Sequence, residues 1–226
     1  MSSVALAEEL LLLAYDDDSG KATGSHIGLD LGMAAAVLVD LALAGRLAYA
    51  GGMIVVVSAA PTGEPIADEV LGRIAADTPH TPASWVQRLR HGLRDRVLAD
   101  LCGRGILTDV DETTLGFIHL HRYPTADGTV ETELRERLGR ALTTDELPDE
   151  RTAALAALVA AARMEPALYL SGDEIAAAHQ RLEQISDAAG FTGTVSMEES
   201  SIRPSVALVV SVLVKAIQTA LGTARA

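Results

Sequence analysis

Five arginines gather in one short segment of an otherwise acidic chain. Those between Trp85 and Gly105 are Arg88, Arg90, Arg94, Arg96 and Arg104. Only Asp95 and Asp100 offset them, so five positive and two negative charges leave this segment at +3, whereas the whole chain of 226 residues carries −13. Guanidinium groups bind phosphate and carboxylate through paired, charge-assisted hydrogen bonds. The segment is therefore a candidate anion-binding site.

Within this segment, Arg90 and Arg94 have the most specific spacing. Thr81 and Pro82 predict the start of a helix that runs towards Cys102, because Thr can cap a helix and Pro fits its first turn. The apolar stripe of that helix would be Val86, Leu89, Leu93, Val97 and Leu101. Arg90 and Arg94 would stand one turn apart beside the stripe, where a partly buried anion could be held. The alternative is a solvated helix face, on which the two aspartates pair with the arginines.

Other candidate groups indicate weaker chemistry. His119 and His121 would share one strand face, but a structural zinc site needs four ligands, so ordinary strand histidines are favoured. The acidic run 16–18 lacks the glutamate of a calcium loop, since the eleventh residue after Asp16 is Ile27, and a solvated turn is expected. Cys102 is expected to be a buried structural thiol. We expect no metal, no cofactor and no catalytic group, because no phosphate-binding Gly loop or nucleophile motif is present.

The helices and strands that must position these residues are indicated first by a sequence pattern that occurs twice, which we call the repeated phrase. Residues 37–47 and 97–107 both read as the end of an amphipathic helix, followed by Gly and Arg and then by an apolar residue that opens a strand. A hairpin is predicted after each copy, at about Leu47 to Val57 and at about Leu107 to Leu120. In the second hairpin the polar tip would be Asp109 to Thr114. The expected fold class is mainly α: a single globular helical domain, residues 1–226, with two short β-hairpins.

Further helices follow from the apolar periodicity. Besides the helix from Thr81, the expected ranges are 4–15, 28–43, 66–76, 130–142, 152–163, 172–189 and 204–219. The helix over 130–142 has three Glu/Arg pairs at a spacing of four residues, and these predict a solvated surface face. The pairs are Glu131/Arg135, Glu133/Arg137 and Glu136/Arg140.

The composition limits the classes of partner. A net charge of −13 argues against broad nucleic-acid binding, which needs many Lys and Arg contacts to phosphate. A single cysteine cannot form an internal disulfide and fits a reducing compartment. Glu8 and Glu9 interrupt the first apolar segment, so no secretory signal is expected. No apolar run is expected to reach the ~18–20 residues of a membrane span, which predicts a cytoplasmic protein with at most peripheral membrane contact.

An ordered set of phrases resembles the Golgi phosphoprotein 3 family. The matching segments are 6–13, 38–47, 61–63 with Asp68, Glu69 and Leu71, then 93–97 leading to 105–107, and finally 151–156. They occur in the family's order over nearly the whole chain. The composition, rich in Ala and Arg and poor in Lys, is similar to that of a bacterial member.

The resemblance implies a helical domain that docks on membranes by binding phosphatidylinositol 4-phosphate. It also implies an adaptor that retains Golgi glycosyltransferases through their cytosolic tails. The family's headgroup site uses one Trp and three Arg, of which Arg94 keeps an arginine here, while Ser25, Ala34 and His91 take the other positions. Arg90, next to His91, is our own addition to the site. The family's hairpin is apolar near its tip; three carboxylates at the tip expected here predict that it does not insert into lipid.

Three classes of function remain open at this point. The first is a non-catalytic binder of an anionic membrane lipid headgroup, or an adaptor, with Arg94, Arg90 and His91 at its binding site. The second is a winged-helix-like DNA-binding regulator, because helix–hairpin units also build such domains. The third is a small-molecule enzyme, for which the sequence offers no recognisable group of residues.

Overall fold

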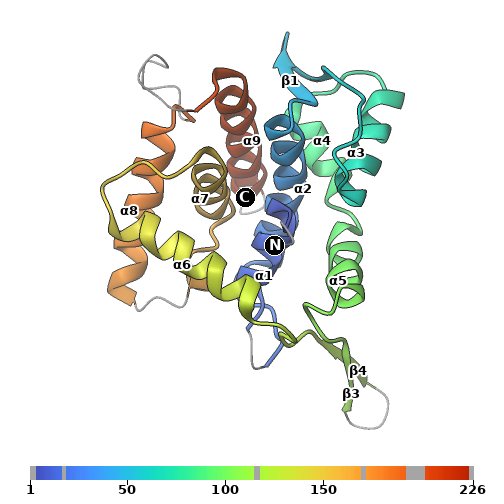
Figure 1. Cartoon of the computed structure of the whole chain (residues 1–226), viewed down its shortest axis with the longest axis vertical. Coiled ribbons are helices and arrows are strands. Elements are labelled where there is room, and N and C mark those ends of the chain that lie inside the picture. The colour runs from blue at the N-terminus through green and yellow to red at the C-terminus, as the bar shows by residue number, and fades with distance from the viewer. Residues whose placement is uncertain (1–3, 17–18, 115–117, 169–171, 192–201, 224–226) are drawn as a thin grey trace.

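The computed structural model describes residues 4–16, 19–114, 118–168, 172–191 and 202–223. The helices are α1 (Leu6–Ala14), α2 (His26–Leu43), α3 (Pro65–Ala76), α4 (Pro82–Leu89), α5 (Leu93–Gly103), α6 (Thr129–Thr143), α7 (Glu150–Ala162), α8 (Gly172–Ala188) and α9 (Pro204–Thr223), with a 3-10 turn at Glu165–Leu168. The strands are β1 (Leu47–Ala50), β2 (Met53–Val56), β3 (Val110–Thr114) and β4 (Ile118–Arg122), and they form two antiparallel pairs. The expected class, mainly α with two short hairpins, is confirmed (Figure 1).

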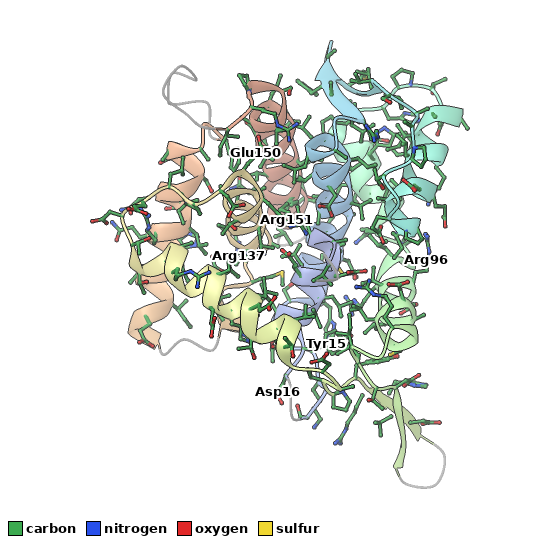
Figure 2. The ribbon with its side chains drawn as sticks, in the orientation of Figure 1. Tyr15, Asp16, Arg96, Arg137, Glu150 and Arg151 are labelled. Carbon is green, nitrogen blue, oxygen red and sulfur yellow. The ribbon has the colours of Figure 1, made fainter. Side chains whose placement is uncertain are left out.

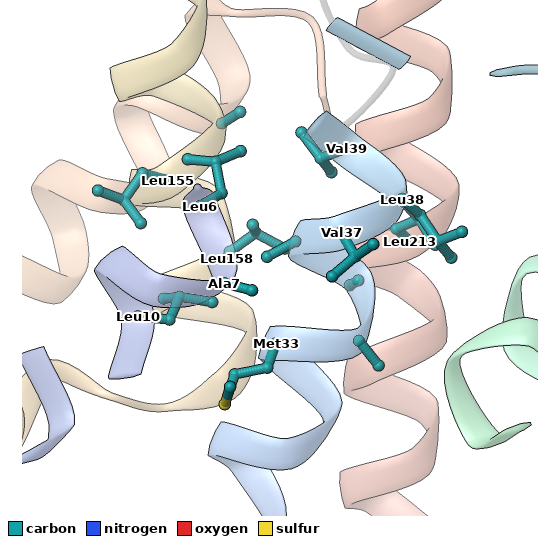
Figure 3. Close-up of a cluster of buried hydrophobic side chains, with 14 of the residues drawn as sticks. Leu6, Ala7, Leu10, Met33, Val37, Leu38, Val39, Leu155, Leu158 and Leu213 are labelled. Atoms are coloured by element: carbon teal, nitrogen blue, oxygen red, sulfur yellow. The ribbon is translucent and has the colours of Figure 1, made fainter. Parts of the chain in front are cut away.

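The core lies where α1, α2, α7 and α9 meet. Every residue of α1 is buried, including two glutamates. Leu10 from α1, Met33 from α2, Leu155 from α7 and Leu213 from α9 are fully buried within one cluster (Figure 3). Fully burying such a side chain stabilises the fold by about 1.5–3 kcal/mol. These four helices therefore form the centre of the fold, with α3–α5 on one side and α6 and α8 on the other (Figure 1).

Glycines allow α2 and α7 to pack closely. A Cβ on Gly28 would collide with the backbone carbonyl of Ala162, at the end of α7. A Cβ on Gly32, one turn further along α2, would lie 3.2 Å from the Ala162 side chain. The first turns of α2 are consequently held against the end of α7, and this fixes where the backbone presents their other side chains.

The repeated phrase encodes the same helix ending twice. Gly45 and Gly105 both adopt positive φ angles, of +69° and +72°. In the first copy the N–H of Arg46 donates to the carbonyl of Leu41 at 2.7 Å, and in the second Ile106 donates to Leu101 at 2.9 Å. These are the bonds by which a left-handed glycine ends a helix. The hairpin after the first copy is also confirmed, with Gly51-Gly52 as its two-residue turn.

The second hairpin differs from the prediction in its turn. Val110 pairs with Arg122 and Thr114 with Ile118, so the acidic stretch runs along β3 and is not the tip. The extended backbone starts early because Leu107 already bridges to Thr125 at the base of the hairpin. Residues 115–117 connect the strands and lie outside the described residues. The prediction that the tip does not insert into lipid therefore stays a prediction.

The single helix expected from Thr81 to Cys102 is in fact two helices. Thr81 does cap the first, since its Oγ1 accepts a hydrogen bond from the Ser84 N–H at 3.3 Å. Gly92 then takes a φ of +71°, which a right-handed helix cannot contain. The predicted apolar stripe nevertheless faces the core on both sides of this break, because Leu89 and Leu93 are both buried. The break separates the arginines of the segment into two groups.

Two helices are longer and more apolar than the sequence analysis allowed. Both α2 and α9 have the length and composition of a membrane span, so the expectation that no apolar run reaches that length was wrong. In the structure, 72% of the tested stretch of α2 and 50% of that of α9 is buried inside the protein. A helix that is apolar on most sides is also what the centre of a bundle requires. These two helices pack directly against each other, so they are only weak indications of a membrane segment.

Candidate anion-binding site between α2 and α5

The start of α2 presents polar groups at a fixed position. Ser25 caps the helix, and its Oγ accepts a hydrogen bond from the Gly28 N–H at 3.1 Å. This cap places His26 at the first position of the helix and Asp30 one turn later. Because Gly28 is held against α7, the carboxylate of Asp30 and the carbonyl of His26 are presented to α5 by a rigid support.

Arg94, at the start of α5, binds to both of these residues. Its Nε donates to Asp30 Oδ1 at 2.9 Å, and its Nη2 lies 2.6 Å from the same oxygen. Nη2 also donates to the carbonyl oxygen of His26 at 2.9 Å, and Nη1 lies 2.8 Å from His26 Nδ1. A guanidinium has only donors, so Nδ1 of His26 must be the acceptor and carries no proton in this arrangement. We call His26, Asp30 and Arg94 the Arg94 cluster.

The Arg94 cluster has no net positive charge in this state. The guanidinium charge is balanced by Asp30, and the Arg94 side chain is only 18% exposed. Tyr15 lies close by; burial raises the pKa of its hydroxyl, and the Arg94 charge opposes that rise. An incoming anion would therefore meet an arginine that already has a carboxylate partner.

Arg90 and His91 lie on the other side of the helix break. Arg90 caps the end of α4, and His91 is exposed beside Gly92. Arg90 and Arg94 are therefore not one turn apart on a single helix, as the sequence predicted, because the left-handed Gly92 stands between them. The Nε of Arg90 is buried and has no hydrogen-bond partner within the described ranges. It is a donor without an acceptor at the junction of α4 and α5.

The remaining arginines of the segment are engaged in ion pairs. The pairs are Arg88 with Asp77 at 2.9 Å, Arg96 with Glu69 at 2.5 Å, and Arg104 with Glu8 at 2.7 Å and Asp100 at 2.9 Å. Of the two aspartates expected to offset this segment, Asp100 does so, while most of the partners come from other elements. The segment is thus neither a bare cationic surface nor a simple solvated face.

The positions that the resemblance assigns to a headgroup site are partly brought together. Ser25 caps α2 directly before His26, which contacts Arg94, so these two positions adjoin. Ala34 is fully buried among the core residues of α2 and cannot present a polar group to an exposed ligand. His91 is exposed at the α4–α5 junction.

Sequence reasoning missed a buried charge network around α1. Glu8 binds Arg104, and Glu9 binds Arg137 at 2.7 Å and Arg151 at 3.1 Å. Figure 2 shows Arg137 and Arg151 near the middle of the molecule. Burial raises the pKa of Glu8 to about 7, against the lowering effects of the Ala5 N–H and of Arg104. The available signal was a pair of adjacent glutamates in a helix whose other residues are Leu and Ala, because such a helix is buried on all sides.

For two of its three Glu/Arg pairs, the solvated face predicted for α6 was also wrong, whereas Glu136 and Arg140 are exposed as expected. Glu131 is 2% exposed and accepts a hydrogen bond from Arg135 Nε at 2.8 Å, so this pair is buried rather than solvated. Arg137 turns inward to Glu9 instead of pairing with Glu133, which is exposed. The helix packs against α1, so the carboxylate of Glu131 on its inner side is covered, whereas that of Glu133 on its outer side is exposed.

The other candidates of the sequence analysis lie outside the Arg94 cluster. Cys102 is half-buried, and burial raises the pKa of its thiol. His121 lies 2.9 Å from Asp109, whose hydrogen bond and charge raise the pKa of the imidazole. Asp16 accepts a hydrogen bond from the Ser19 N–H at 2.8 Å, while 17–18 lie outside the described residues, as does the side chain of His119. Within the described part of the chain, no three acidic, His or Cys side chains form a metal-binding group.

Comparison with known protein families gives a match that spans this fold. The family model described as Golgi phosphoprotein 3 (GPP34) matches residues 6–219 of the chain. The matched range includes all three residues of the Arg94 cluster and the whole buried charge network. It agrees with the resemblance inferred from the matching segments of the sequence.

Proposed function

The chain belongs to the Golgi phosphoprotein 3 family, and on that premise we propose that it binds an anionic lipid headgroup through Arg94, Arg90 and His91. Membership of this non-enzymatic family indicates a lipid-binding or adaptor role at a membrane surface. The proposal adds the ligand and the residues: the phosphate of phosphatidylinositol 4-phosphate, held where α2, α4 and α5 meet.

The observation that carries the proposal is the fixed position of the Arg94 guanidinium. Its bonds to Asp30 and His26 orient it before any ligand arrives, so little conformational entropy is lost on binding. Arg90 adds a buried Nε that lacks an acceptor among the described residues. A phosphate oxygen placed at the junction of α4 and α5 would supply one.

An exposed apolar side chain lies next to the Arg94 cluster. Ile27 is 48% exposed and precedes Asp30 by three residues, so the two share one side of α2. Apolar side chains beside cationic groups are typical of surfaces that rest in the headgroup region of a membrane. The protein would then sit peripherally on the cytoplasmic face of a membrane, with the first turn of α2 towards the lipid.

Asp30 sets the strength of this interaction. A phosphate must share or replace the carboxylate that now neutralises Arg94. The variant Asp30→Asn, which keeps the side-chain shape but removes its charge, is therefore expected to bind anionic vesicles more tightly than the natural chain.

Vesicle co-sedimentation tests the proposal. Vesicles of phosphatidylcholine alone are compared with vesicles that also contain phosphatidylinositol 4-phosphate, or phosphatidylserine at the same total charge. Arg94→Gln and Arg90→Gln should each weaken binding about 10- to 100-fold, because a hydrogen bond to a charged group contributes about 1.5–3 kcal/mol. Arg88→Gln is the matched control: it removes the same charge from the same segment, but from an arginine paired with Asp77.

The proposal fails if the natural chain binds none of the anionic vesicles, or if all three arginine variants bind them equally. Circular dichroism separates loss of binding from loss of folding, and Arg90→Gln is informative even if Arg94→Gln unfolds, because Arg90 has no ion pair among the described residues. By the same family premise, we propose that the cytosolic tails of membrane enzymes are the protein partners of this adaptor.

A further inference from the structure

A cavity lies away from the Arg94 cluster, at the opposite end of α2. It has a volume of about 430 Å³ and is half open to solvent. Its walls come from the start of α1, the end of α2, the loop 61–64, the first turn of α3, and α7. The charged and polar residues that line it are Asp40, Thr62, Glu64 and Arg151, and its apolar walls include Val4, Leu43 and Ala67. Arg151 is labelled in Figure 2.

Two of the charged groups form a fixed pair inside the cavity. Arg151 Nη1 donates to Asp40 Oδ1 at 2.8 Å, and the backbone N–H of Leu6 donates to Asp40 Oδ2 at 2.7 Å. Arg151 also donates through Nη2 to the carbonyl of Val4, and through both Nε and Nη2 to Glu9. Of its five N–H groups, four are thus in use, whereas each carboxylate oxygen of Asp40 keeps a free lone pair.

Glu64 adds a second carboxylate with spare acceptor capacity. Its Oε2 caps α3 by accepting a hydrogen bond from the Ala67 N–H at 2.9 Å. In the described part of the chain, its Oε1 accepts no hydrogen bond. Among the side chains that line the cavity there are thus two carboxylates and one guanidinium, which is shared with Glu9 outside the cavity. Arg46 and Arg203 bind the backbone carbonyls of Ala44 and Leu43 at its edge, and Arg203 is itself paired with Glu150.

This balance selects the charge of the ligand. An anion would face two carboxylates and find at most one unused N–H. A cation with several N–H donors would satisfy Asp40 and Glu64 together, and charge-assisted hydrogen bonds of this kind are the strong ones. The apolar walls can bury a short hydrocarbon stem, and the volume lies within the range of small-molecule sites.

We propose that this cavity binds a primary ammonium group carried on a short apolar stem. Asp40 and Glu64 accept its N–H hydrogens, and Val4, Leu43 and Ala67 cover the stem. Arg151 holds Asp40 in place and repels a second cation. The site is independent of headgroup binding, since Asp30 and Asp40 are ten residues apart on α2, which corresponds to about 15 Å along the helix.

Ligand-observed NMR tests this inference with n-butylamine as the probe. The neutral n-butanol has the same butyl stem, and the anionic n-butyrate has a propyl stem that is one carbon shorter; both serve as ligand controls. Glu64→Gln removes the charge but keeps a carbonyl oxygen that can cap α3. Its matched control is Glu133→Gln, which removes the same charge from the exposed face of α6. Butylamine should bind the natural chain and Glu133→Gln alike, and its Kd should rise about tenfold in Glu64→Gln, because one charge-assisted bond is lost.

Amide chemical shifts locate the binding. In the natural chain, butylamine should shift the N–H signals of Ala44, Gly63 and Ala67, which border the cavity. The inference is overturned if butylamine binds Glu64→Gln as tightly as the natural chain, if butanol or butyrate binds equally well, or if the shifted amides lie elsewhere. Since none of these readouts involves lipid, failure here leaves the proposed headgroup site untouched.

Discussion

The buried carboxylate of Glu8 makes stability depend on pH in an unusual direction. Glu8 is 1% exposed, and its two oxygens are bonded to the Ala5 N–H and to Arg104. Burial raises its pKa from 4.5 to about 7 in the folded protein. In this range of pH the folded state holds a proton that the unfolded state releases. The contribution of Glu8 to the free energy of unfolding is therefore present at low pH, and it is lost as the pH rises from 4.5 to about 7.

The size of the effect follows from the two pKa values. For a pKa of about 7 in the folded state and 4.5 in the unfolded state, the free energy of unfolding should fall by roughly 2–3 kcal/mol between about pH 5 and pH 8. Arg104 is 32% exposed, so solvent screens its charge and weakens its attraction for Glu8. In Glu8→Gln the titrating group is absent, and the variant should gain about 2 kcal/mol relative to the natural chain over the same interval.

Urea unfolding at a series of pH values measures this difference. The comparison of the two chains is needed because Asp40, whose pKa burial raises to about 6, shifts stability in the same direction. Glu69→Gln is the control: its carboxylate is 54% exposed and pairs with Arg96, so it should keep the pH profile of the natural chain. If Glu8→Gln and the natural chain keep parallel profiles between about pH 5 and pH 8, then Glu8 titrates normally and the reasoning is refuted.

Two glycine substitutions test the packing of helices, and the alkylation of Cys102 tests the burial of its thiol. Gly28→Ala should lower the free energy of unfolding by about 1–3 kcal/mol, because the new methyl group meets the carbonyl of Ala162. Gly72→Ala, on an open face of α3, should raise it by about 0.5–1 kcal/mol. Equal effects of the two substitutions in urea unfolding would contradict the close approach of α2 and α7. Cys102 should be alkylated more slowly by iodoacetamide at neutral pH in the folded protein than in urea, since burial raises its pKa and only the thiolate reacts; equal rates would show an exposed thiol.

Local signals in the sequence account for most of the fold. Thr81-Pro82 and Gly51-Gly52 specify a helix start and a hairpin turn through bonds between near neighbours, and both were found as predicted. The break at Gly92 was missed because an apolar stripe continues through it, and periodicity alone does not report one left-handed residue. The turn of the second hairpin was misplaced because polar residues suggested a tip, whereas pairing with the following strand decided the register.

The candidate site was predictable only in part. The sequence singled out Arg94, but its partners His26 and Asp30 are more than sixty residues away, and no local pattern could pair them. The burial of Glu131 was missed for the same reason. Its spacing to Arg135 was recognised, but the contact of α6 with the core joins segments that are far apart in the sequence. Buried ion pairs cannot be distinguished from solvated ones by spacing, because the same Glu/Arg interval serves both.

The pair formed by Asp30 and Arg94 also bears on which headgroups can compete for the arginine. Asp30 carries one negative charge and is held rigidly by α2. A phosphodiester lipid carries one charge as well, so exchanging it for Asp30 gains little electrostatic energy. A phosphate monoester carries about −1.5 to −2 charges near neutral pH and has three acceptor oxygens. In the proposed site it would bind Arg94 together with the Nε of Arg90, which lacks an acceptor among the described residues, while Asp30 keeps part of its contact. If the headgroup site is as proposed, the carboxylate of Asp30 should therefore weaken binding to monoesters less than binding to diesters, and this acidic partner would be a source of selectivity.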